Sequence, residues 1–299
     1  MNRANERPFE DLAKHMQGLP KFHYAALTGK TDLLHKLLSD DSIIISSVDI
    51  YGRTALHIAA SHDEYSSLKL LCKHCCKDKE TLDRSDSFGY TALHYAVQGA
   101  NTYCAKLLLD SGCDVNPTQH SKCTPLHLAA LYGYPELVVL LCEHGANVHA
   151  RSSYQETPLQ MATRSGIRIR EKLKVHYTTL ALLLKFGSSA NVRDSEGISP
   201  LHYVAMHCER KECAALLCAA GASIRYRNHG NVTAVHVARF AEVKNFLRQL
   251  ERMPPRLEHL CLLAVRQGLR NDLTTKVQHL PLPKPLKDKI LFKTLPRVL

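Results

Sequence analysis

Apolar residues recur along most of the chain in short runs at helical spacing, and polar stretches that contain glycine separate them. Leu137–Leu141 and Leu180–Leu184 are two such runs, and each is followed a few residues later by Gly145 or Gly187. A glycine just past an apolar helix is typical of a left-handed cap that ends it. The pattern therefore predicts many short helices. No run approaches the roughly 18 apolar residues of a membrane-spanning helix.

A four-residue motif repeats along the chain at nearly constant intervals. It opens with Thr or Ser, continues with Ala or Pro and then Leu or Val, and ends, with one exception, in His. Its spacings are 37, 33, 33, 42 and 34 residues, which is the signature of a stack of similar units. A degenerate copy with His23 in register precedes the others. The six copies begin at Thr54, Thr91, Thr124, Thr157, Ser199 and Thr233.

Each residue type of the motif has a physical reason. The hydroxyl of Thr or Ser can accept a hydrogen bond from an unpaired N–H of the first helical turn, and proline needs no donor there. We expect the His, at a fixed place in every unit, to tie its helix to a loop rather than to catalyse a reaction. Asp and Gly, as in Asp49 and Gly52, come five and two residues before the Thr or Ser, and they predict a hairpin between successive helix pairs.

This repeat resembles the ankyrin repeat, whose signature is Thr-Pro-Leu-His-x-Ala at a period of 33 residues. The resemblance implies an all-α fold, an ankyrin-repeat solenoid of about seven helix-turn-helix repeats with hairpin loops. We expect the repeats to span residues 20–252, the first of them degenerate, after a polar N-terminal segment at 1–19.

A different pattern begins at Met253-Pro-Pro255, where two prolines predict the end of the last repeat helix. The tail at 253–299 resembles a SOCS box, the C-terminal helical module of the ankyrin-repeat and SOCS-box family. The alternative is a helix pair that merely caps the solenoid. The first half of the resemblance rests on Leu257, Leu260, Cys261 and Val265, and the second on Leu280, Pro281, Leu282, Pro283 and Leu286.

The resemblance implies that the first set of tail residues binds elongin and that the second binds the cullin. The implied partners are the elongin B/C dimer, cullin-five with its RING subunit, and a protein substrate that the sequence does not identify. The chain would then be the non-catalytic substrate-recognition subunit of a ubiquitin ligase. The competing hypothesis is an ankyrin scaffold or inhibitor that holds partners without ubiquitin transfer.

The substrate is expected to bind where hairpin tips and first helices line one face of the array. Aromatic and arginine side chains dominate the energetics of such interfaces. Some of these residues would, on the alternative interpretation, only pack on neighbouring tips. The same offsets in successive units identify Tyr51, Arg53, His62, Phe88, Tyr90, Tyr132, Tyr154 and Arg164.

The unit with the spacing of 42 carries an insertion, which we place near Ser165–His176, between its two helices. It contains Arg168 and Arg170. Insertions in repeat arrays map to loops on one face, often the binding face. We expect this basic segment either to contact an acidic patch of the target or to form a solvated extension of the first helix.

The net charge of +11 does not favour nucleic-acid binding, because it is concentrated in two segments. Residues 253–299 contribute +6 and residues 164–176 contribute +4, which leaves no basic stripe along the repeats. The 11 cysteines lie mostly within apolar runs, and Met1–Leu12 has no apolar stretch of a secretory signal. We therefore expect a chain that is cytoplasmic or also nuclear, with no membrane or nucleic-acid partner.

A metal site, a cofactor or an enzymatic activity is not expected. Cys72, His74, Cys75 and Cys76 form one dense group, but no second Cys/His pair at ligand spacing accompanies them. The sequence contains no nucleophile constellation beyond the repeat pattern and no glycine-rich phosphate loop.

Overall fold

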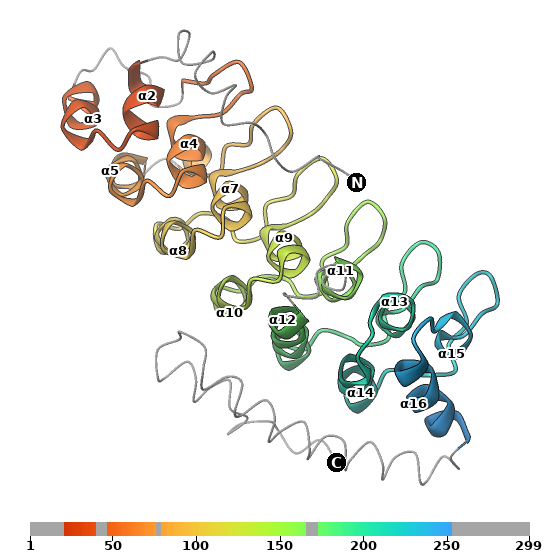
Figure 1. Ribbon diagram of the computed structural model, residues 1–299. Coiled ribbons are helices and arrows are strands. Elements are labelled where there is room, and N and C mark those ends of the chain that lie inside the picture. Colours follow the sequence, from red (N-terminus) through yellow and green to blue (C-terminus); the bar gives the residue numbers. More distant parts are fainter. Residues whose placement is uncertain (1–20, 40–46, 76–78, 166–172, 253–299) are drawn as a thin grey trace. The chain divides into compact units, whose positions relative to one another are not determined.

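The computed structural model describes residues 21–39, 47–75, 79–165 and 173–252, which belong to two compact units divided between His120 and Ser121 (Figure 1). In each unit, helices come in pairs joined by short turns, and hairpin loops project beside the first helix of each pair. The described residues contain no strand. This arrangement confirms the predicted all-α solenoid of helix-turn-helix repeats.

Unit 1 contains three helix pairs. The first helices pack side by side, α2 on α4 and α4 on α7, and so do the second helices, α3 on α5 and α5 on α8. A short helix, α6 (Lys79–Leu82), follows α5 in the unit with the spacing of 37. The pairs are α2 (Lys21–Leu27) with α3 (Thr31–Leu38), α4 (Ala55–Ser61) with α5 (Tyr65–Cys75), and α7 (Ala92–Gln98) with α8 (Thr102–Asp110).

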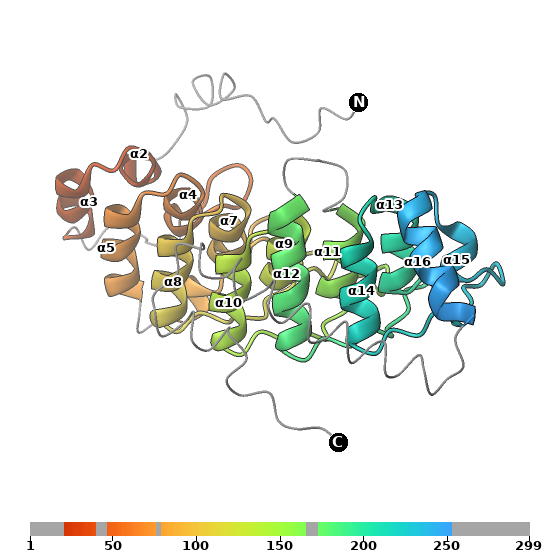
Figure 2. The ribbon, with the colours of Figure 1, turned by 60° about the horizontal axis from the view of Figure 1, so that its bottom comes forward.

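Unit 2 contains four helix pairs in the same two rows (Figure 2). The row of first helices runs through α9, α11, α13 and α15, and the row of second helices through α10, α12, α14 and α16. The pairs are α9 (Pro125–Tyr132) with α10 (Pro135–Glu143), α11 (Pro158–Ser165) with α12 (Leu173–Lys185), α13 (Pro200–His207) with α14 (Lys211–Ala219), and α15 (Ala234–Val237) with α16 (Ala241–Arg252).

The ends of the helices follow the sequence motifs. In α4, the backbone N–H of Thr54 donates to His57 Nδ1 at 3.0 Å, and this pair forms a reciprocal capping box. The same box opens α7, α9 and α13. Past the second helices, Gly112 and Gly145 have φ of +88° and +87°, as left-handed caps require. The predicted capping roles of these residues are confirmed.

The long unit adds length to its second helix. Helix α11 has eight residues, as α9 has, whereas α12 has 13 and α10 has nine. The expected extension of the first helix is therefore wrong for the described residues. The added turn of α12 includes His176, which is buried, and a Cβ atom at Gly133 would lie 2.6 Å from its ring. This part of the insertion packs on the end of α9 and is not a solvated loop.

Candidate partner-binding surfaces

The histidines of the motif connect each first helix to the hairpin of the next repeat. His57 Nε2 donates to the carbonyl of Tyr90 at 2.9 Å, and His127 Nε2 donates to the carbonyl of Glu156 at 3.1 Å. Burial lowers the pKa of both histidines to about 4, so they are neutral near pH 7. The predicted structural role is confirmed for these residues.

Gln160 performs the same task in the one unit whose motif lacks His. Its Oε1 accepts the backbone N–H of Thr157 at 3.0 Å, and its Nε2 donates to the carbonyl of Ile198 at 2.9 Å. An amide presents one acceptor and one donor at the spacing of the two imidazole nitrogens. The exception in the motif is therefore a chemical equivalent.

The hairpin tips of unit 1 expose large apolar side chains. Phe88 is 45% exposed and Ile50 is 79% exposed, and the Ser87 N–H donates to the carbonyl of Tyr51 at 3.0 Å, which joins the two tips. Arg53 is directed to its own hairpin, where its Nε donates to Asp49 Oδ2 at 2.8 Å and its guanidinium lies 5.1 Å from the Tyr51 ring centroid. Tyr51 and Phe88 are thus accessible to a partner, whereas Arg53 is neutralised.

Two other predicted contact residues of unit 1 are half-buried. The Tyr90 ring lies 5.5 Å from the rings of both His94 and Tyr95, so it packs within the repeat. Burial, followed by the nearby positive charge of Arg53, lowers the pKa of His62 at the end of α4. Tyr90 therefore follows the alternative interpretation, in which the side chain packs on its neighbours.

Unit 2 separates its predicted aromatic residues in the same way. Tyr154, at a hairpin tip, is 67% exposed. Tyr132 is half-buried, and its ring stacks on Tyr134 with 5.7 Å between centroids. Tyr154 is therefore the aromatic contact residue that unit 2 leaves accessible among those predicted.

Arg164 belongs to a polar network that begins in the core. Its Nη1 lies 3.0 Å from Glu156 Oε1, and the Glu156 side chain is 2% exposed while that of Arg164 is 46% exposed. Nearby, the Tyr203 hydroxyl donates to Asp194 Oδ2 at 2.6 Å. Burial raises the pKa of Glu156, Arg164 counteracts the shift, and Asp194 adds to it. The network places one guanidinium, anchored from below, at the surface beside α11.

Three residues of this network were not identified from the sequence. Glu156 carries a usable signal, since it is the only acidic residue that directly precedes the Thr or Ser of a motif. Tyr203 and Asp194 repeat a pair seen in unit 1, where Tyr95 donates to Asp86 at 2.7 Å. The spacing of nine residues between Asp and Tyr in both pairs would have predicted the contact.

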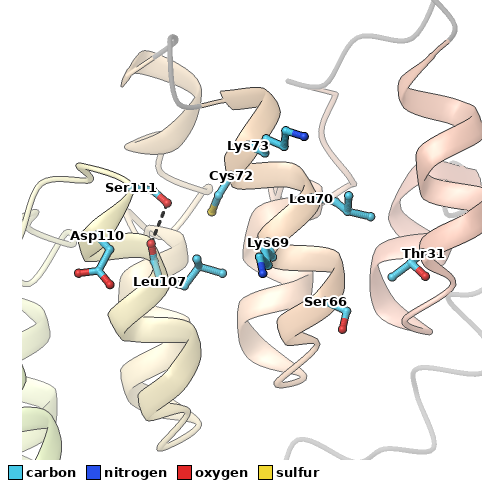
Figure 3. A pocket seen from close by; sticks show the side chains of 9 residues that line it. All are labelled: Thr31, Ser66, Lys69, Leu70, Cys72, Lys73, Leu107, Asp110 and Ser111. Carbon is cyan, nitrogen blue, oxygen red and sulfur yellow. Dashed lines mark hydrogen bonds between the residues drawn. The ribbon is translucent and has the colours of Figure 1, made fainter.

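A hollow of about 710 Å³ lies on the second-helix side of unit 1 (Figure 3). A small-molecule site gathers a few polar groups in a mostly apolar, enclosed cavity. This hollow is open and mixed in character, and its Ser111 hydroxyl is already bonded to the carbonyl of Leu107 at 2.7 Å. We therefore do not assign a ligand to it. Its lining residues are Thr31, Ser66, Lys69, Leu70, Cys72, Lys73, Leu107, Asp110 and Ser111.

Other predicted features are placed as follows. Cys72 and Cys75 are buried in the core of unit 1, and the described residues hold no group of three potential metal ligands. None of the described helices could cross a membrane. Arg168, Arg170 and all elongin- and cullin-binding residues predicted in the tail lie outside the described residues.

Family models match three stretches of the chain that together exceed half its length. Residues 22–119 match a model of three ankyrin repeats, 108–162 a model of many copies, and 196–229 a single ankyrin repeat. Two solved structures share the fold. The human ASB11 ankyrin repeat domain gives a TM-score of 0.65 at 22% identity, covering 79% of this chain and 100% of that one. The ankyrin repeat domain of Bcl-3 gives 0.64 at 25%, covering 77% and 99%.

Related sequences align with the repeats. Dog inversin (Canis lupus familiaris) is 31% identical over 247 residues, which cover 72% of this chain but only 19% of inversin. Human ankyrin repeat and SOCS box protein 16 is 32% identical over 179 residues, which cover 60% of this chain and 38% of that protein. The chain thus spans a minor part of the length of these relatives.

Proposed function

Because the chain belongs to the ankyrin-repeat proteins, we propose that it is a protein-binding scaffold that recruits substrates to a cullin-RING ubiquitin ligase. The repeats would capture the target, and the tail would dock on elongin C of the elongin B/C dimer and on cullin-five. The chain itself would catalyse nothing, because the RING subunit and its charged E2 enzyme supply the transfer chemistry.

One observation carries this proposal: the two halves of the tail pattern stand in order directly after the last repeat. Leu257, Cys261 and Val265 are four residues apart, so they share one face of a helix. The Leu280–Pro283 element follows them. Similarity to human ankyrin repeat and SOCS box protein 16 supports the assignment. The ASB11 domain supports the ankyrin fold alone.

The second candidate function is a scaffold or inhibitor that binds a partner without ubiquitin transfer. It is favoured by the likeness to inversin and to Bcl-3, which is described as a member of the IkappaB protein family. Both candidates use the same binding surfaces, so they differ only in the role of the tail.

A comparison of captured proteins separates the two candidates. The full chain, and a variant with Leu257→Pro and Cys261→Phe, would each be expressed with a proximity label in cells treated with a proteasome inhibitor. A ligase receptor predicts that both forms label the same targets, and that only the wild-type chain labels elongin B/C and raises target ubiquitination. Equal ubiquitination of the targets by both forms would favour the plain scaffold.

A further inference from the structure

Three hairpins of unit 2 carry an arginine at the same position, six residues before the Thr or Ser of the next motif. In unit 1, Val48 and Ser85 hold this position. A fourth arginine stands two residues before the last of the three, and all four are exposed. The set, called the arginine ladder below, consists of Arg151, Arg193, Arg225 and Arg227.

Contacts with the hairpins hold the ladder in place. Arg151 Nη1 donates to the carbonyl of Gln155 at 3.2 Å and to the carbonyl of Arg193, on the next hairpin, at 3.1 Å. The guanidinium of Arg193 lies 5.6 Å from the ring centroid of Tyr226 on the hairpin after that. Arg227 Nη1 donates to a carbonyl of its own hairpin at 2.9 Å. These contacts reduce the side-chain freedom that binding would otherwise remove.

No ion pair within the described residues neutralises the ladder. Arg53 and Arg164, by contrast, are paired with Asp49 and Glu156 at 2.7 and 3.0 Å. Of the acidic residues on the three hairpins, only Glu196 is exposed. Each guanidinium has five N–H donors, and the printed bonds occupy only part of them. The ladder therefore keeps both charge and donors for an acceptor outside the molecule.

We propose that the arginine ladder binds an extended acidic segment of a partner protein, with one carboxylate at each of the three hairpins. The planar guanidinium fork matches a carboxylate in a bidentate manner. Packed helices are roughly 8–10 Å apart, and an extended chain advances about 3.3 Å per residue. Successive carboxylates should therefore be about three residues apart.

A protein segment fits these hairpins better than a nucleic acid does. Arg193 covers the Tyr226 ring, which reduces its capacity to stack on a base, and Glu196 interrupts the positive surface. A phosphate backbone also responds mainly to the number of cations it meets, whereas spaced carboxylates respond to where the cations stand. The inference rests on the proposed function, because it names the chemistry of the target that the array would capture.

The test is fluorescence anisotropy with the full chain and two labelled peptides of equal composition. One peptide carries Glu at every third position, and the other carries the same glutamates in one block. We expect the spaced peptide to bind at least about tenfold more tightly, and the reversals Arg151→Glu, Arg193→Glu and Arg227→Glu to abolish the difference. The control variant changes the charge equally at three other exposed arginines of unit 2, Arg210, Arg248 and Arg252, and should bind as the wild type does.

Three results would overturn the inference. One is equal affinity for the two peptides, one is the absence of binding to either, and one is tighter binding to duplex DNA that the same reversals remove. Circular dichroism would establish that the reversal variant folds. Elongin B/C binding, measured on the same variant, keeps the two proposals apart, since the ladder lies outside the tail. A chain that binds the spaced peptide but not elongin B/C would refute the ligase alone.

Discussion

Glu156 and Arg164 form an ion pair in which the carboxylate is buried and the guanidinium is half-exposed, 3.0 Å apart. Arg164 was predicted from its position to contact a target. The structure gives it a second task, because a buried carboxylate is tolerated when a cation compensates it. Effects of Arg164 variants on binding must therefore be separated from effects on folding.

Removal of Arg164 should expose the cost of the buried carboxylate. We expect Arg164→Ala to lower the free energy of unfolding at pH 7 by about 2 kcal/mol, and added Glu156→Gln to restore most of it. Since burial raises the pKa of Glu156 in the folded state, the deficit should shrink as the pH falls and Glu156 takes up a proton. Urea unfolding at several pH values checks this. A single variant as stable as the wild type at pH 7 would contradict it.

The capping histidines should make the repeats sensitive to acid. Unfolded histidines titrate near 6.5, whereas burial holds the pKa of His57 and His127 at about 4. Between these values the unfolded chain binds more protons, so stability is present above pH 6.5 and is lost as the pH falls toward 4. At 1.36 kcal/mol per pKa unit, the loss is roughly 3 kcal/mol per histidine.

Gln160 indicates how to remove this sensitivity. The variant with His57→Gln and His127→Gln should match the wild type within about 1 kcal/mol at pH 7.5 and lose much less stability at pH 5. Thermal unfolding across this pH range measures the difference. Replacement of the exposed His35 and His149 by Gln is the control and should leave the wild-type slope in place. An unchanged slope in the first variant would mean that these histidines are not the acid-sensitive groups.

The exposed and packed aromatic residues should separate in their effects. Tyr51→Ala, Phe88→Ala and Tyr154→Ala are expected to weaken partner capture by about tenfold in total or more, with little change in stability. Tyr90→Ala should instead lower stability by about 2 kcal/mol, because its ring packs on two neighbours. Quantitative pull-down and thermal unfolding of the same variants measure the two effects. Unchanged capture by the triple variant would exclude these tips as the binding surface.

The repeat pattern predicted the fold well because its residues act locally. Thr54 and His57 meet within one helical turn, and Gly145 ends a helix by its own backbone conformation. Such contacts depend on spacing along the chain, so a sequence displays them. The extra turn of α12 could not be foreseen, because it depends on how His176 packs on Gly133, more than 40 residues away.

The candidate surfaces were predictable in position but less so in accessibility. The offsets identified Tyr90 and Tyr154 alike, yet one packs on neighbouring rings and the other is exposed. That distinction depends on the identity of residues on adjacent elements, such as Tyr95. The Glu156–Arg164 pair and the arginine ladder were missed because each residue was assessed within its own unit.

The cullin-binding element should be separable from the elongin-binding one. Replacement of Leu280–Pro283 by alanines is expected to weaken recruitment of cullin-five and to leave elongin B/C binding intact. Size-exclusion chromatography of the chain with elongin B/C, with and without cullin-five, measures both steps. Loss of both interactions together would mean that the element only supports the tail.

The central claim is most directly tested by titrating purified elongin B/C into the full-length chain by isothermal calorimetry. Leu257 and Cys261 lie one helical turn apart, so both side chains can enter one pocket. The account predicts saturable one-to-one binding that Leu257→Pro with Cys261→Phe abolishes, while circular dichroism of the repeats stays at the wild-type level. Absence of binding by the wild-type chain, or equal binding by the folded variant, would contradict the claim.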